Sequence, residues 1–134
     1  MLTLTEANQA ITAALARAHH MKNDIAVSVC DDEGRLVAFQ RMDGVFAEAI
    51  PLALGRAIGA AASRKSGGDK DAVLDLQRVW RVAGTGLPIA PGPGGLAITR
   101  NARTLGAIGV CGSATDQEDE QCAKAGVDAF DQSS

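Results

Sequence analysis

The chain has 134 residues, a length that suits one domain with a buried core and is too short for two comfortable ones. Its formal net charge is −3 and it has only three phenylalanines, one tryptophan and no tyrosine. It therefore lacks both the basic surface of a duplex or anionic-lipid binder and the ring platforms of a single-strand binder. Alanine supplies 25 residues and glycine 15, which predicts elements that pack closely over small side chains. We expect one domain, residues 1–134, with neither nucleic-acid nor membrane partners.

Neither a signal peptide nor a membrane span is predicted. The first residues lack a basic segment followed by an apolar run, and no apolar stretch approaches the roughly 18 residues of a span. Cys30, Cys111 and Cys122 show no Cys-x-x-Cys spacing, which favours reduced thiols over a disulfide, with one reactive thiol as the alternative. These features predict a cytoplasmic protein.

The first predicted helix runs from about Thr3 to His20. Thr3 and Glu6 have the spacing of a capping box, and apolar residues recur at helical intervals from Ala7 to Ala18. Because this stripe is mostly alanine, the helix should lie close against the layer that it covers.

Two hairpins are predicted from short apolar runs separated by turn residues. The first has strands at 25–30 and 35–42, joined by a turn in which Gly34 supplies a positive φ. The second has strands at 96–100 and 104–111.

Three further helices are predicted over 49–64, 69–82 and 116–130. The stretch 84–95 is rich in glycine and proline and indicates a loop, with a short extended piece at 87–90 as an additional strand. This order predicts an α+β layered domain in which a central antiparallel sheet of about five strands is flanked by helices.

Arginines provide the first candidates for ligand binding. Arg41 and Asp43 lie two residues apart at the end of a strand, so their side chains should project to one side as a pocket wall. An exposed ion pair between them fits the spacing equally well. Arg56 lies in an otherwise apolar helix, where a guanidinium should pair with a carboxylate or bind an anionic ligand.

The turn at Gly112 leads from a strand into the last helix, whose free N–H groups can hold a carboxylate or phosphate. No Gly-Lys-Ser/Thr follows, and the glycine spacing is not that of a dinucleotide-binding motif. The acids at the start of this helix, including Asp119 and Glu120, compete with a bound anion. They are interpreted as solvated side chains rather than as a metal site.

His19 and His20 end the first helix, and adjacent side chains on a helix point about 100° apart, so the pair cannot easily share one metal ion. The simplest interpretation is a pair of cations near a helix C-terminus. A neutral imidazole is also a common ligand of haem iron, so either histidine is a candidate for that role.

Six segments spread over nearly the whole chain carry a family resemblance: LTLTEA at 2–7, VCDDEG at 29–34, LVAFQRMDG at 36–44, GGLAI at 94–98, LGAIGVCG at 105–112 and QEDEQCA at 117–123. Together they resemble the GlcG/HbpS family, which includes glycolate-operon GlcG proteins, the haem-binding protein HbpS and the C-terminal domain of PduO-type cobalamin adenosyltransferases. The resemblance implies a profilin-like fold and homo-oligomers, often tetramers or octamers.

The resemblance also implies a small-ligand-binding protein, with haem, a related tetrapyrrole or an organic acid as the ligand. Arg56 stands where the family usually has lysine, and Cys111 where it usually has serine. The residues implied in binding, including those that match the family's motifs, are Arg41, Asp43, Arg56, Gly95, Gly112 and Asp119, with His19 or His20 as candidates toward haem.

Two alternatives stay open. One is an isomerase, lyase or hydrolase acting on a small carboxylated catabolic intermediate, with Asp43 or Glu120 as general base and Arg56 as the electrophilic clamp. The other is a structural or signalling partner whose pocket is vestigial.

Overall fold

The computed structural model describes residues 1–66 and 93–133. The helix predicted over 69–82 and the extended piece predicted over 87–90 lie outside these residues. The described elements are α1 (Leu4–His20), β1 (Ala26–Asp31), β2 (Leu36–Arg41), α2 (Ala49–Ser66), β3 (Gly95–Arg100), β4 (Arg103–Cys111) and α4 (Asp116–Ser133). All seven predicted elements within the described residues are present.

One antiparallel sheet joins the two hairpins in the order β2-β1-β4-β3. The α+β class is therefore confirmed. The expected count of about five strands is wrong for the described residues, where the sheet has four strands. Each hairpin supplies two strands. The additional strand was predicted at 87–90, which lies outside the described residues.

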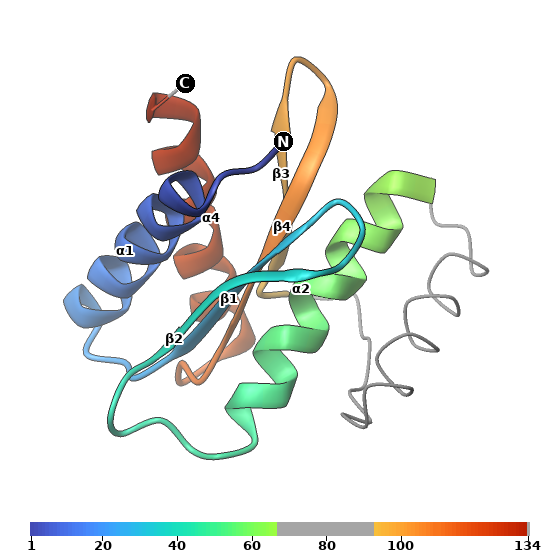
Figure 1. Cartoon of the computed structure of the whole chain (residues 1–134). Helices are drawn as coiled ribbons and strands as arrows, with labels where there is room; N and C mark the ends of the chain where they lie inside the picture. Colours follow the sequence, from blue (N-terminus) through green and yellow to red (C-terminus); the bar gives the residue numbers. More distant parts are fainter. Residues whose placement is uncertain (67–92, 134) are drawn as a thin grey trace.

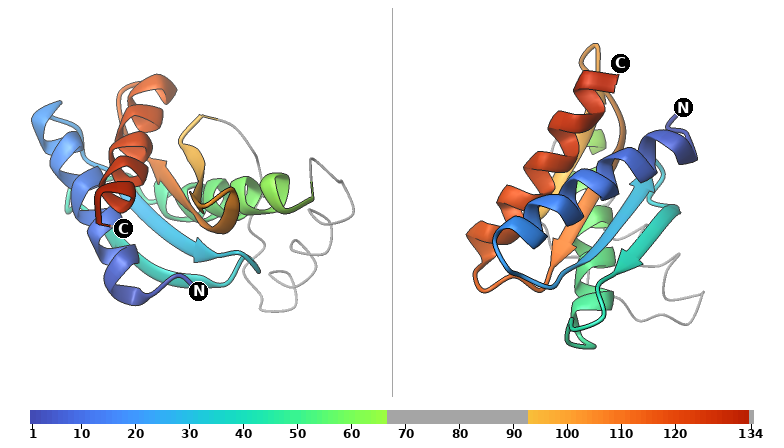
Figure 2. Two further views of the ribbon diagram at one scale, coloured as in Figure 1. Left: turned by 90° about the horizontal axis from the view of Figure 1, so that it is seen from above. Right: turned by 90° about the vertical axis from the view of Figure 1, so that its left-hand side faces the viewer.

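The helices form a layer on each face of the sheet. α1 and α4 pack against each other and cover one face, whereas α2 covers the other face, where it contacts β1, β3 and β4. Figure 1 and the view from above in Figure 2 show the sheet between these two layers. Both faces of the central strands are thus buried.

The two faces of the sheet carry side chains of different size. The face toward α1 and α4 is built from fully buried branched residues: Val27, Val29, Ile98, Ile108 and Val110. Because side chains alternate along a strand, the neighbouring positions face α2, and these are small: Ala26, Ser28, Cys30, Ala107, Gly109 and Cys111. The sheet therefore lets α2 approach more closely than α1 or α4.

Gly109 marks the closest approach of α2 to the sheet. A Cβ atom at this position would lie 2.5 Å from the Ala57 nitrogen and would also overlap the Ala53 carbonyl oxygen. Beside it, the Ser28 hydroxyl donates a 2.8 Å hydrogen bond to the same Ala53 carbonyl. The backbone of α2 thus rests directly on the backbone of the sheet.

The capping box predicted for α1 is confirmed. The Thr3 backbone N–H donates to Glu6 Oε1 at 3.0 Å, and the Glu6 N–H donates to Thr3 Oγ1 at 3.1 Å. Glu6 also accepts from Arg100 Nη2 at 2.6 Å, and the Arg100 guanidinium lies 4.8 Å from the centre of the Phe130 ring. One arginine on β3 therefore links the start of α1 to the end of α4.

Both hairpin turns use left-handed backbone. Gly34 has a φ of 76°, as predicted. In the second hairpin, Arg100 pairs with Arg103, which leaves Asn101 and Ala102 as a two-residue loop with φ of 53° and 63°. Positive φ at both central residues is typical of a tight hairpin turn, and alanine is an unusual residue for it.

Among residues 1–66 and 93–133, no helix combines the length and the apolarity needed to cross a membrane.

Substitution Gly109→Ala should destabilise the fold. An added methyl would force α2 away from the sheet, and overpacking of this kind costs about 1–3 kcal/mol. Where space is open, the same substitution stabilises a protein by roughly 0.4–1 kcal/mol, so the sign of the change is diagnostic. Urea unfolding measures it, and an unchanged or higher unfolding free energy would show that α2 does not rest on Gly109.

Candidate functional site

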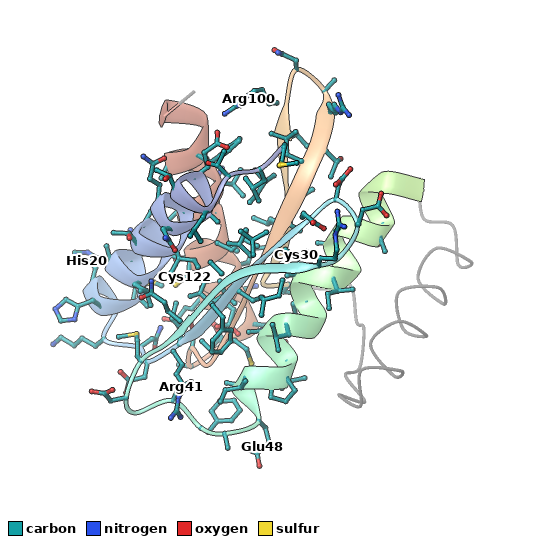
Figure 3. All side chains as sticks on the ribbon, viewed as in Figure 1. His20, Cys30, Arg41, Glu48, Arg100 and Cys122 are labelled. Atoms are coloured by element: carbon teal, nitrogen blue, oxygen red, sulfur yellow. The ribbon has the colours of Figure 1, made fainter. Side chains whose placement is uncertain are left out.

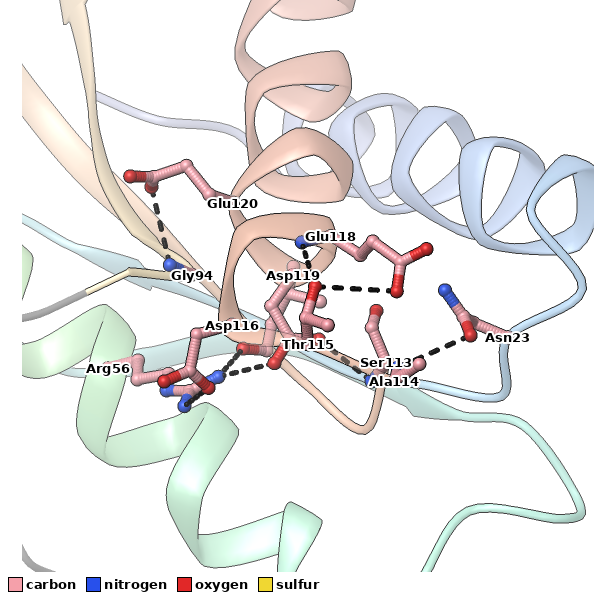
Figure 4. Close-up of polar contacts among 11 residues, drawn as sticks. Asn23, Arg56, Gly94, Ser113, Ala114, Thr115, Asp116, Glu118, Asp119 and Glu120 are labelled. Atoms are coloured by element: carbon pink, nitrogen blue, oxygen red, sulfur yellow. Dashed lines mark hydrogen bonds and ion pairs between the residues drawn. The ribbon is translucent and has the colours of Figure 1, made fainter.

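A buried ion pair joins the two helix layers at the end of the sheet. Arg56 extends from α2, and its Nη1 donates to Asp119 Oδ2 on α4 at 2.7 Å and to the Val110 carbonyl oxygen on β4 at 2.6 Å. Nη2 lies 3.3 Å from Asp116 Oδ1 (Figure 4). The side chains of Arg56 and Asp119 are 16% and 3% exposed, whereas that of Asp116 is 70% exposed. Asp119 is therefore the principal partner.

The Arg56 side chain takes the place of one backbone hydrogen bond that a regular β3–β4 ladder would contain. The Val110 N–H donates to the Gly94 carbonyl at 2.8 Å, and a regular antiparallel pair would return a bond from the Gly94 N–H to the Val110 carbonyl. The Gly94 N–H instead donates to Glu120 Oε1 at 3.3 Å, and the Val110 carbonyl accepts from Arg56. Side chains from α2 and α4 thus complete the end of the β3–β4 ladder.

The route of Arg56 past the sheet requires two glycines. A Cβ atom at Gly94, where φ is +96°, would lie 2.9 Å from Arg56 Nη1 and 2.6 Å from the Val110 carbonyl oxygen. A Cβ atom at Gly95 would lie 2.5 Å from the Arg56 carbonyl oxygen. The sequence predicted Gly95 to lie near a ligand. In the structure, it lies where α2 passes closest to β3.

Asp119 holds the turn between β4 and α4 as well as Arg56. Its second oxygen, Oδ1, accepts from the Ser113 N–H at 2.9 Å. At the start of the helix the Thr115 hydroxyl accepts from the Glu118 N–H at 3.1 Å, so Thr115 rather than Ser113 makes the capping bond. Both carboxylate oxygens of the buried Asp119 have partners, which is what a charge in this position requires.

The charges of this site affect Cys111, which ends β4. Burial raises the pKa of the Cys111 thiol, and the nearby Arg56 charge opposes this shift without cancelling it. The Arg56 pKa is itself raised, because the hydrogen bond to Asp119 and the surrounding negative charges outweigh the effect of burial. The Cys111 thiol is therefore protonated at neutral pH and is not an activated nucleophile.

Gly112 has a conformational role in the same turn. Its φ is +124°, and a Cβ atom there would lie 2.5 Å from the Asp24 carbonyl oxygen and 2.8 Å from Val45 Cγ2. The turn therefore packs against both the start of β1 and the loop that leads into α2.

Arg41 and Asp43 lie apart from the Arg56 cluster, although at the same end of the sheet. Arg41 pairs with Ala26, which in turn pairs with Cys111, so β1 separates Arg41 from β4. Both side chains are exposed, and neither makes an ion pair or hydrogen bond with the described residues. Figure 3 shows Arg41 at the lower end of the molecule. The alternative interpretation, an ion pair between the two residues, is not observed.

The two histidines also lie outside the cluster. His19 and His20 are exposed at the C-terminal end of α1, on the other face of the sheet from α2. The ring of His20 points away from the body of the protein in Figure 3. Within the described residues, no group of three or more histidine, cysteine or acidic side chains is arranged to hold a metal ion.

Sequence reasoning found part of this cluster and missed the rest. Arg56, Gly95, Asp119 and Glu120 were candidates and lie together here. The contributions of Gly94, Asp116 and the Val110 carbonyl were not predicted. The Gly-Gly pair at 94–95 was a usable signal, because adjacent glycines before a strand indicate a close approach of backbone or side chain.

Comparisons with known proteins agree on one family. A family model described as "Haem degrading protein HbpS-like" matches residues 2–128. An uncharacterised 15.0 kDa protein from the dhaT–dhaS intergenic region of Citrobacter freundii is 29% identical over 138 residues, covering 96% of this chain and 92% of that protein.

Solved structures share the fold. ORFY of Klebsiella pneumoniae is 25% identical with a TM-score of 0.71, and the match covers 96% of this chain and 90% of that one. A double mutant of Streptomyces reticuli HbpS is 24% identical, with a TM-score of 0.72 and coverage of 96% and 86%. A PduOC–haem complex is 20% identical, with a TM-score of 0.71 and coverage of 96% and 94%. At these last two identities the likeness establishes the fold alone.

Replacing Arg56 should strongly destabilise the protein. Arg56→Met leaves the buried Asp119 charge without its cationic partner, and breaking a buried pair on one side costs about 3–5 kcal/mol. Arg56→Lys should cost less, because an ammonium group can still reach Asp119 but cannot reproduce the planar fork. Asp116→Asn is the control, since exposed pairs contribute up to roughly 1 kcal/mol. Equal unfolding free energies for Arg56→Met and Asp116→Asn would contradict the role given to the buried pair.

The buried thiols should make stability fall at high pH. Burial raises the pKa of Cys30 to about 12 and that of Cys122 to about 11, from an ordinary value of 9.0. Above pH 9 the unfolded chain therefore loses thiol protons that the folded chain retains, which favours unfolding. The unfolding free energy should decline between about pH 9 and pH 11, and less so in Cys122→Ala. An identical decline in that variant would exclude this thiol as a cause.

Proposed function

The chain belongs to the HbpS-like family, and on this premise we propose that it binds a small carboxylate-bearing ligand, with haem or a related tetrapyrrole as the leading candidate. The observation that carries the proposal is the match of residues 2–128 to a family described as haem degrading. A haem complex among the structures that share the fold is consistent with it.

The proposed site lies at the end of the sheet where β1 begins and β4 ends. Three loops meet there, since Gly112 contacts both Asp24 and Val45. Arg41 lies at the same end, is exposed, and has no partner among the described residues, so its guanidinium is available to a propionate or another carboxylate. Asp43, two residues further along the chain, adds a negative charge to the same loop.

Arg56 contributes indirectly in this proposal. Its guanidinium is already engaged by Asp119, Asp116 and the Val110 carbonyl, so it shapes the Gly112 turn rather than meeting the ligand. This assignment differs from the expectation that Arg56 itself holds the carboxylate. It leaves Arg41 as the cation that meets the ligand.

His19 and His20 are the proposed ligands toward haem iron. Both rings are exposed and make no hydrogen bond to the described residues, so a ring nitrogen is free to coordinate. With only four aromatic side chains in the whole chain, a flat ligand needs aliphatic walls and a neighbouring subunit to cover it. We therefore include a homo-oligomer, a tetramer or octamer, in the proposal. The proposed location is the cytoplasm.

No specific observation favours the enzyme alternative. Arg56, its electrophilic clamp, is held by two aspartates, and Glu120, one of its candidate bases, accepts the Gly94 N–H.

Titration with haemin tests the proposal. The full chain should produce a sharp Soret band that saturates at a fixed stoichiometry, and either His19→Ala or His20→Ala should shift or abolish it, because one imidazole ligand is lost. Diffuse uptake that does not saturate and is unaffected by either variant would exclude specific haem ligation.

Arg41→Ala should weaken haemin affinity by roughly tenfold or more, the value of one hydrogen bond to a charged group. Lys124→Ala on the exposed surface of α4 is the matched control and should leave affinity unchanged. Equal affinities for the two variants would show that Arg41 is not part of the site. Haem binding itself would still be tested by the two histidine variants.

A further inference from the structure

A separate hollow lies at the opposite end of the sheet from the Arg56 cluster. It has a volume of about 260 Å³ and is lined by the β1–β2 turn, the start of β4 and the N-terminal residues. Figure 1 shows the N-terminus lying near both hairpin turns at this end. None of its lining residues belongs to the cluster around Arg56 or to the site proposed for haem.

The floor of the hollow is apolar and packs against the core. Leu2 is 5% exposed, and its Cδ2 lies 3.1 Å from where a Cβ of Gly106 would be, so the leucine fills the space that this glycine leaves. Val37 and Leu105 are half-buried and pack against the same core. A ligand resting here would cover an aliphatic surface.

The wall formed by the first hairpin turn is rigid. Asp31 Oδ1 accepts from the backbone N–H groups of Glu33 and Arg35, each at 2.9 Å, and Oδ2 accepts from Arg35 Nε at 2.9 Å. The Asp31 carboxylate is therefore fully used by its own turn. The two terminal amino groups of Arg35 make no bond to the described residues.

Two further charged side chains line the hollow and have no partner among residues 1–66 and 93–133. Asp32 follows Asp31 in the first turn, and Arg103 begins β4 directly after the second turn. Neither forms an ion pair or hydrogen bond with the described residues. One acid and one base that have no partner in the described part of the chain thus lie above an aliphatic floor.

We propose that this hollow binds a small zwitterion of the size and kind of an apolar α-amino acid. The ligand's carboxylate would accept from Arg103 and from the terminal amino groups of Arg35, its ammonium group would donate to Asp32, and its side chain would cover the half-buried Val37 and Leu105. Pockets for drug-sized ligands measure about 300–1,000 Å³, so the hollow suits a smaller molecule and is too small for a tetrapyrrole. This inference is independent of the proposed haem site.

Calorimetric titration of the full chain with L-leucine, 4-methylpentanoate and 3-methylbutylamine tests the proposal. The first probe carries both charges, and each of the others carries one charge on the same aliphatic body. Leucine should bind saturably, and each single-charge probe should bind at least roughly tenfold more weakly, since one charged hydrogen bond is lost. Absence of saturable leucine binding at millimolar concentration, or equal binding of 4-methylpentanoate, would overturn it.

Variants locate the binding. Arg103→Ala and Asp32→Asn are substitutions at solvent-accessible positions that should preserve the fold, and each should weaken leucine binding by roughly tenfold or more. Lys124→Ala should leave it unchanged. Leucine affinity that is the same in all three variants would place the binding elsewhere and reject this hollow as the site.

Discussion

The buried pair of Arg56 and Asp119 is the interaction on which the end of this fold depends. It joins α2, on one face of the sheet, to α4 on the other, and among the described residues it is the only buried ion pair between them, since Asp116, the other partner of Arg56, is 70% exposed. Because Asp119 also accepts the Ser113 N–H and Arg56 also donates to the Val110 carbonyl, the pair fixes the β4–α4 turn and closes the β3–β4 ladder. A charge pair this well enclosed is retained only when nearly all of its hydrogen-bonding groups are satisfied, and the surrounding glycines make the room for that.

The two faces of the sheet carry side chains of different size, and this difference sets how closely each helix layer approaches. Branched residues such as Val29 and Ile108 fill the space beneath α1 and α4, whereas Ser28 and Gly109 let the backbone of α2 touch the sheet. Because α2 lies this close to the strands, the Arg56 side chain can extend past the end of the sheet to α4 in the opposite layer. The small residues on this face of the sheet are therefore a requirement of the close approach of α2.

The two ends of the sheet carry different chemistry. At one end the glycine turn, the Arg56 pair and the exposed Arg41 surround the site proposed for a tetrapyrrole or related acid. At the other end the two hairpin turns place Asp32 and Arg103 above an aliphatic floor. The scaffold thus presents two separate sets of charged groups on loops that a rigid sheet holds in place, which is the usual arrangement of binding residues in small domains.

The sequence alone determined the local structure: the Thr3–Glu6 capping box, the alanine stripe of α1, the left-handed Gly34 and the two hairpins. Each depends on residues that lie within one continuous short segment of the chain, so periodicity and turn chemistry suffice to predict it. It also indicated that Arg56 pairs with a carboxylate or binds an anionic ligand. Only the tertiary structure decided that the carboxylate is Asp119, 63 residues away, and that Arg41 lies apart from this pair. Strand order and register set those distances, and they result from packing the whole chain rather than from any local pattern.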